Sequence, residues 1–218
     1  MKVLVVGASR GSGNQVVREL AAAGHDVTAF ARTASAADYG DAAVRRVDGD
    51  VMSPADVEKA VIGQDAVVVT LGISDNPLKV QWLHRASTPL RVRSDGTREV
   101  VGAMQRQGVT RLVVESMYGL GDTYRNLPIS LKVFLSFVIK RQVEDSERQE
   151  DVVRGSGLDW TLIRPVVLHD GEETEAARVS ANDEFDGLKV SRRQVARAIA
   201  ETLGRSDAAH ATLTVSGR

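Results

Sequence analysis

Three glycines close to the amino terminus are the first residues of this chain that could do chemistry. They follow the short apolar run Val3–Val6 and precede residues with helical periodicity. Glycine permits positive φ and close backbone approach, and the free amides of a helical first turn attract anions. The order of strand, glycine-rich turn and helix therefore predicts a pyrophosphate site. Its expected contacts are Gly7, Ser9, Arg10, Gly11, Ser12 and Gly13.

The spacing of these glycines, G-x-x-x-G-x-G, differs from the commonest dinucleotide fingerprint, G-x-G-x-x-G. The prediction therefore depends on the position of the turn between a strand and a helix. The alternative is a turn whose glycines only allow the helix and the strand to pack closely.

The second chemical feature is Arg32, which directly follows the apolar run Val27–Ala31. A site that prefers NAD carries an acidic residue about 20 residues after the glycine turn, where it binds the ribose 2′-hydroxyl. Arg32 and Arg10 could instead clamp a 2′-phosphate through charge-assisted hydrogen bonds. We therefore expect NADP(H) to be preferred over NAD(H). The alternative is that Arg32 is an ordinary surface charge.

Two further strand ends add expected contacts to the same cofactor. Asp50 and Val51 follow the third apolar run, and Asp50 could accept a hydrogen bond from the adenine amino group. Asp50 could also only cap the turn that precedes Pro54. Leu71 and Gly72 end the fourth run and would flank the ribose.

Short apolar runs alternate along the chain with segments of helical periodicity, a pattern that predicts βα units and buried parallel strands. We expect one α/β domain over residues 1–218, with a Rossmann-type doubly wound parallel sheet. The predicted strands are Val3–Val6, Val27–Ala31, Val44–Val47, Ala66–Thr70, Leu112–Glu115, Thr161–Arg164 and Thr212–Val215. The predicted helices are Gly13–Ala23, Pro54–Val61, Gly96–Gln107, a long segment around Ile129–Arg154, and Arg192–Leu203.

The composition narrows the classes of function. A formal net charge of -1 favours neither nucleic acid nor an anionic membrane surface, and we expect neither as a partner. The absence of cysteine excludes disulfides and thiolate chemistry, and the four histidines lack metal-ligand spacing, so we predict no metal. The first apolar run is too short for a signal peptide, and no run approaches a membrane span. We expect a cytoplasmic protein.

Several longer motifs together resemble one family. They are Val3–Ser9, Asp48–Val51, Ser94–Arg98, Arg111–Val114 and Ser156–Pro165. The chain is similar over nearly its whole length to the atypical short-chain dehydrogenases/reductases, in the branch that includes biliverdin reductase B (flavin reductase) and the NmrA-like regulators. The resemblance implies the cofactor contacts already named. It also implies that the nicotinamide borders Ser116, Met117, Pro165, Val166 and Val167.

The chain departs from the larger short-chain reductase family in one respect that concerns the reaction. That family uses a tyrosine followed four residues later by a lysine, so that the phenol can donate a proton. Here the tyrosines Tyr39, Tyr118 and Tyr124 are followed at that spacing by Ala43, Asp122 and Pro128. We therefore expect hydride transfer to an acceptor that needs little help with protons, such as a flavin, a quinone or a tetrapyrrole.

The remaining expectations concern the acceptor. Ser116 and Tyr118 are the candidate catalytic residues, and the alternative is that both are ordinary strand-end residues. We predict a substrate loop at residues 72–94, and at 124–141 an apolar pocket or subunit-interface segment that could also be a helix packed on the sheet.

The expected partner is a small-molecule acceptor, and the expected state is a monomer or a homodimer. Two other functions stay open. One is a non-catalytic NADP(H) redox sensor of the NmrA-like type, because fold alone does not determine function. The other is an isomerase, which we set behind both because we find no acid–base groups for it.

Overall fold

The computed structural model describes residues 1–72, 88–171 and 173–217. These residues form an eight-stranded sheet in the order β3-β2-β1-β4-β5-β6-β10-β8, together with a two-stranded sheet of β7 and β9. The strands of the large sheet are β1 Lys2–Val6, β2 Asp26–Ala31, β3 Val44–Asp48, β4 Ala66–Val69, β5 Arg111–Glu115, β6 Asp159–Pro165, β8 Arg178–Ser180 and β10 Ala211–Ser216. All of them are parallel except β8, which runs antiparallel to β10. The predicted doubly wound Rossmann-type sheet is confirmed.

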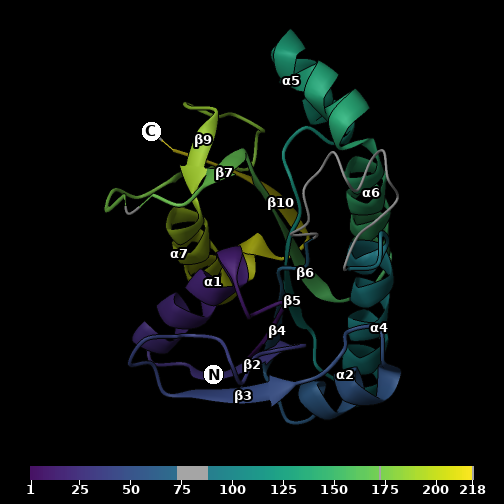
Figure 1. Cartoon of the computed structure of the whole chain (residues 1–218), viewed down its shortest axis with the longest axis vertical. Coiled ribbons are helices and arrows are strands. Elements are labelled where there is room, and N and C mark those ends of the chain that lie inside the picture. Colours follow the sequence, from purple (N-terminus) through teal and green to yellow (C-terminus); the bar gives the residue numbers. More distant parts are fainter. Residues whose placement is uncertain (73–87, 172, 218) are drawn as a thin grey trace.

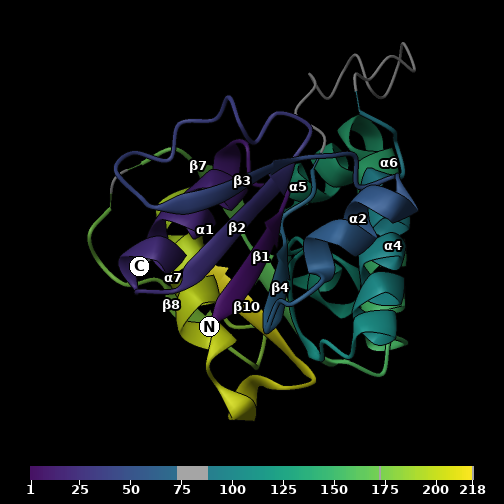
Figure 2. The ribbon, with the colours of Figure 1, turned by 90° about the horizontal axis from the view of Figure 1, so that it is seen from below.

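Helices cover both faces of this sheet (Figures 1 and 2). The helices α1 (Gly11–Ala22) and α7 (Arg192–Leu203) pack together on one face, and α2 (Pro54–Val61), α4 (Val92–Gln107) and α6 (Lys140–Arg154) on the other. Successive side chains of β1 pack on opposite faces of the sheet. Val3 and Val5 belong to the core under α1 and α7, whereas Leu4 and Val6 belong to the core under α2 and α4. This alternation explains why the strand has to be apolar throughout.

The structure differs from the sequence prediction at several places. Helix α4 begins at Val92 rather than Gly96, because Asp145 of α6 accepts hydrogen bonds from the backbone amides of Arg93 and Ser94 and so caps it. Helix α1 begins at Gly11, two residues before the predicted start. Strands β7 (Val167–His169), β8 and β9 (Lys189–Ser191) were not predicted, because three residues are too few to show a periodicity.

The predicted long helical segment is interrupted. Helix α5 (Ile129–Val133) continues into the π-helical turn η2 (Phe134–Val138), and the backbone leaves helical geometry at Ile139 before α6 begins. The segment is therefore not one continuous helix, and α5 projects beyond the end of α6 (Figure 1). Within the described ranges, no helix has the length and apolarity to span a membrane.

Candidate active site

A cavity of about 990 Å³ lies at the carboxyl ends of β1, β2, β4, β5 and β6. The strand order reverses between β1 and β4, which is the point where ligands bind in open α/β sheets. Apart from Gly13, every cofactor or catalytic residue predicted from the sequence lines this cavity. They are Gly7, Ser9, Arg10, Gly11, Ser12, Arg32, Asp50, Val51, Leu71, Gly72, Ser116, Met117, Tyr118, Pro165, Val166 and Val167.

The glycine turn is drawn tightly against the sheet. Gly7 has a φ of +88°, and a Cβ on it would come within 2.7 Å of the Thr70 carbonyl oxygen. A Cβ on Gly13 would lie 2.3 Å from the Gly7 carbonyl oxygen. The glycines therefore do allow the close packing of helix and strand that the alternative prediction named.

The same turn also fits a pyrophosphate. Among the described residues, no side chain caps the amino terminus of α1, and its first turn contains no acidic residue. The backbone amides there can hydrogen-bond to a bound anion, and the helix dipole favours negative charge at this end.

The part of the cavity predicted to bind the adenosine end of the cofactor contains both predicted arginines. The exposed Arg32 follows β2, and its Nη2 donates a hydrogen bond to Thr88 Oγ1 at 3.1 Å. Arg10 is an exposed residue of the glycine turn. Asp50 accepts a hydrogen bond from the Met52 amide at 2.9 Å through Oδ1, the turn-capping role that was the alternative for this residue.

Ser116 belongs to a buried polar network under the cavity. Its hydroxyl donates to Glu150 at 2.7 Å, and the Arg164 guanidinium donates to both oxygens of the same carboxylate, at 2.8 and 2.6 Å. Burial alone would raise the pKa of Glu150, but Arg164, the Ser116 hydrogen bond and Arg154 together lower it below its ordinary value. The hydroxyl proton of Ser116 is donated to Glu150. The Ser116 oxygen can therefore interact with a bound molecule only as a hydrogen-bond acceptor.

Tyr118 lines the cavity, and its hydroxyl group is already hydrogen-bonded within the protein. Its ring packs edge-on against Phe185, with centroids 5.2 Å apart, and only 5% of the residue is exposed. The hydroxyl donates to the Asp183 carbonyl oxygen and accepts from Asn126, both at 3.3 Å. These contacts hold the phenol in place on one side of the cavity.

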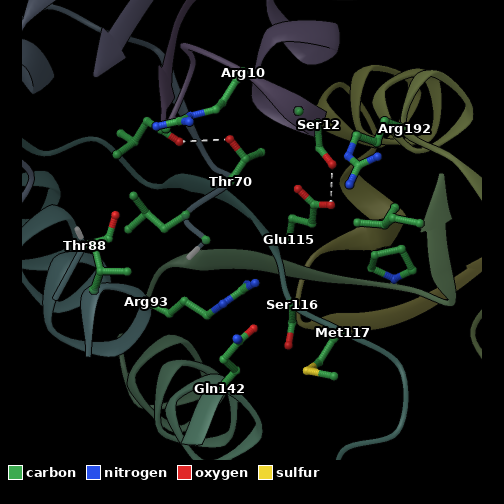
Figure 3. Close-up of a pocket in the computed structure, with 18 of the residues that line it drawn as sticks. Arg10, Ser12, Thr70, Thr88, Arg93, Glu115, Ser116, Met117, Gln142 and Arg192 are labelled. Carbon is green, nitrogen blue, oxygen red and sulfur yellow. Dashed lines mark hydrogen bonds between the residues drawn. The ribbon is translucent and has the colours of Figure 1, made fainter. Parts of the chain in front are cut away.

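Three charged residues that the sequence analysis did not single out meet at the centre of the cavity, although Arg93 falls within the predicted substrate loop 72–94. Glu115 ends β5, Arg93 comes from α4 and Arg192 begins α7. Figure 3 shows Glu115 with Ser12 and Arg192 on one side and Arg93 on the other. A charged residue at the carboxyl end of a buried strand was a signal for Glu115, but no local pattern indicates the two arginines.

Glu115 and Arg93 are both perturbed by burial. Burial raises the pKa of Glu115, although the Ser12 hydrogen bond at 2.7 Å and the charges of Arg93 and Arg192 oppose this rise. Burial lowers the pKa of Arg93, and the charges of Glu115 and Asp145 oppose that shift. The Arg93 Nε is buried and has no hydrogen-bond partner in the described part of the chain.

Apolar side chains form one wall of the cavity. Leu127, α5 and η2 contribute most of this wall, which we call the acceptor wall. Its members are Leu127, Leu131, Phe134, Leu135 and Ile139. The predicted pocket segment 124–141 therefore does reach the cavity. Of the predicted substrate loop 72–94, residues 73–87 lie outside the described residues, whereas Gly72, Thr88 and Arg93 line the cavity.

Solved structures with this fold include a short-chain dehydrogenase/reductase and an anaerobillin reductase. A short-chain dehydrogenase/reductase from Veillonella parvula, in complex with NADP, is 20% identical with a TM-score of 0.74, and the match covers 100% of this chain and 94% of that one. ChuY, an anaerobillin reductase from Escherichia coli O157:H7, is 22% identical with a TM-score of 0.75, covering 99% and 97% of the two chains. At these identities the likeness establishes the fold.

Comparison of sequences gives the family. An uncharacterised chloroplast protein of Arabidopsis thaliana, At2g34460, is 26% identical over 226 residues, which cover 100% of this chain and 77% of that protein. The family model described as NAD(P)H-binding matches residues 7–206, which include the glycine turn, the acceptor wall and every other described residue of the cavity lining except Val6. The chain therefore belongs to this NAD(P)H-binding family.

Proposed function

We propose that this protein is an NADPH-dependent oxidoreductase that transfers a hydride to a flat, conjugated acceptor of the flavin, quinone or tetrapyrrole class. The observation on which this depends is the continuity of the cavity, which runs from Arg10 and Arg32 past Ser116 to the acceptor wall. Its volume is at the upper end of the range for small-molecule sites. It therefore offers room for an acceptor beside the dinucleotide.

Two features support a conjugated acceptor. The acceptor wall is apolar and lines the same cavity as the strand ends predicted to border the nicotinamide, so a flat ring system could pack against it. The chain also lacks the Tyr-x-x-x-Lys pair that carbonyl reduction uses in the larger family. The similar fold of ChuY, described as an anaerobillin reductase, agrees with the tetrapyrrole class.

The direct test combines binding with turnover. Purified protein is titrated calorimetrically with NADPH and NADH, and oxidation of each cofactor is then followed with FMN, riboflavin, quinones and biliverdin. NADPH oxidation that depends on one of these acceptors supports the proposal. Tight NADPH binding without turnover of any acceptor contradicts it and favours the redox sensor.

The proposed preference for NADPH gives a separate prediction for Arg32. Hydrogen bonds to charged groups contribute about 1.5–3 kcal/mol, so Arg32→Ala is expected to weaken NADPH binding about 10- to 100-fold. NADH lacks the 2′-phosphate, and its dissociation constant is expected to stay within about twofold of the wild-type value. Calorimetric titration of both cofactors measures the two changes.

Arg45→Ala provides the control, because Arg45 is an exposed arginine of the neighbouring strand β3 that does not line the cavity. It is expected to leave both affinities unchanged. An Arg32→Ala protein that kept the wild-type ratio of NADPH to NADH affinity would show that Arg32 does not bind the 2′-phosphate.

A further inference from the structure

The cavity contains one buried acidic side chain among its described lining residues. Asp50 and Asp170 are exposed at the rim, whereas Glu115 is only 6% exposed and lies at its centre. Glu115 directly precedes Ser116 and Met117, the residues predicted to border the nicotinamide. A carboxyl group here is well placed to face both cofactor and acceptor.

Contacts from several elements hold Glu115 in place. Ser12 of α1 donates a hydrogen bond to its Oε1 at 2.7 Å, and Arg93 of α4 and Arg192 of α7 act on it through their charges. On the sheet, its neighbour on β6 is the apolar Ile163. Ser12 also belongs to the turn that would bind the pyrophosphate, so a bound dinucleotide would lie beside this carboxyl group.

Each neighbouring arginine has a second carboxylate nearby. Arg192 forms an ion pair with Asp170 at 2.6 Å, and Asp145 interacts with Arg93 by charge. Neither arginine therefore depends on Glu115 alone for compensation, and burial favours the protonated acid. Negative phosphate charge bound near Ser12 would favour the protonated acid further.

We propose that Glu115 donates the proton that accompanies hydride transfer, in place of the Tyr-Lys pair that this chain lacks. This inference rests on the proposed function. NADPH supplies the hydride, which forms a new bond to one atom of the conjugated acceptor, and the displaced electron pair moves to a nitrogen or oxygen of the same system. That atom takes the proton as the O–H bond of Glu115 breaks.

The reaction is balanced when solvent returns a proton to Glu115. NADPH, the acceptor and one proton give NADP⁺ and the acceptor reduced by two hydrogens. Arg93 and Arg192 stabilise the carboxylate that remains after each transfer, which lowers the cost of releasing the proton.

Glu115→Gln tests the proposal, because glutamine keeps the shape of the side chain and can still accept the Ser12 hydrogen bond, but cannot release a proton. General acid catalysis typically contributes 10²–10⁴-fold, so we expect kcat to fall by roughly that factor. The dissociation constant of NADP⁺ is expected to stay within about threefold of the wild-type value. Glu144→Gln is the matched control, since the Glu144 side chain is 42% exposed on α6 and does not line the cavity, and the kcat of this variant should not change.

The pH profile separates proton donation from simple positioning. Only the protonated acid donates, so wild-type kcat should fall as pH rises through the pKa of Glu115, and Glu115→Gln should lack this limb. Ser12→Ala removes a donor that stabilises the carboxylate, so the limb should move to higher pH. Glu115→Asp keeps a titratable group and should retain the limb at a lower kcat. This variant keeps the test valid if Glu115→Gln does not fold.

Infrared difference spectroscopy gives a readout without turnover. At the pH of maximal turnover, or at neutral pH if no acceptor is reduced, the complex with NADP⁺ should show a protonated-carboxyl band that disappears in Glu115→Gln and persists in Glu144→Gln. The proposal is overturned if that band is absent, if Glu115→Gln keeps the wild-type kcat and pH profile, or if this variant loses only NADP⁺ affinity. A wild-type protein that reduces no acceptor would instead refute the proposed function, and the infrared test of Glu115 would still stand.

Discussion

Alanine in place of Gly13 is expected to weaken NADP(H) binding by about 100-fold or more. The new Cβ would lie 2.3 Å from the Gly7 carbonyl oxygen and 2.5 Å from Thr70 Oγ1. Because the Gly7 oxygen belongs to the backbone, a side-chain rotation cannot relieve the contact, and α1 has to move away from β1 and β4. A displacement of about 1 Å in a positioned site can cost 10²-fold. Calorimetric titration with NADPH measures the loss.

The same substitution should affect stability less than binding. Overpacking costs about 1–3 kcal/mol, whereas alanine gains up to about 1 kcal/mol over glycine within a helix. We therefore expect Tm to fall by no more than about 8 °C. Gly204→Ala is the control, because Gly204 has a negative φ and a Cβ at this position would have no described atom within 4 Å. Undiminished NADPH affinity in Gly13→Ala would show that the position of this turn does not determine binding.

Removing the charge of Glu150 should produce the largest loss of stability. Glu150 is 2% exposed, and its carboxylate is the partner of Arg164, which is itself 7% exposed. Loss of one member of a buried ion pair leaves the other charge without compensation and costs about 3–5 kcal/mol. For a chain of this size, Glu150→Gln should lower Tm by about 6–20 °C, as measured by thermal unfolding.

A double variant distinguishes the charge effect from a packing effect. Glu150→Met alone leaves the Arg164 guanidinium buried and unpaired, whereas Glu150→Met with Arg164→Met removes both charges. The double variant should be more stable than Glu150→Met. If the two substitutions were simply additive, the ion pair would not be the cause of the loss.

The pH dependence of stability provides a second measurement on Glu150. Its pKa is lowered in the folded protein from an ordinary value of 4.5. Its contribution is therefore fully present above that value and is lost as pH falls through the lowered folded-state pKa. Glu150→Gln should be less stable than the wild type at neutral pH, and the difference should diminish in acid.

The sequence by itself determined the class of fold and the position of the glycine turn that we predict to bind the dinucleotide. Both depend on local patterns: short apolar runs mark the buried strands, and Gly7 and Gly13 stand between a strand and a helix. Such patterns can be recognised from residues adjacent in the chain. The same local logic located Ser116 and Gly72 at strand ends, because parallel strands bring their carboxyl ends to one edge of the sheet.

Only the tertiary structure decided which buried polar residues meet in the cavity and beneath it. Ser12 and Glu115 are 103 positions apart, Ser94 and Asp145 are 51 apart, and Ser116 and Glu150 are 34 apart. Burial and hydrogen bonding between such residues depend on how α1, α4 and α6 pack on the sheet, and no local periodicity encodes that packing. The sequence could therefore predict a cofactor site at this edge of the sheet, whereas the buried acid in the same cavity became evident only once the helices were in place.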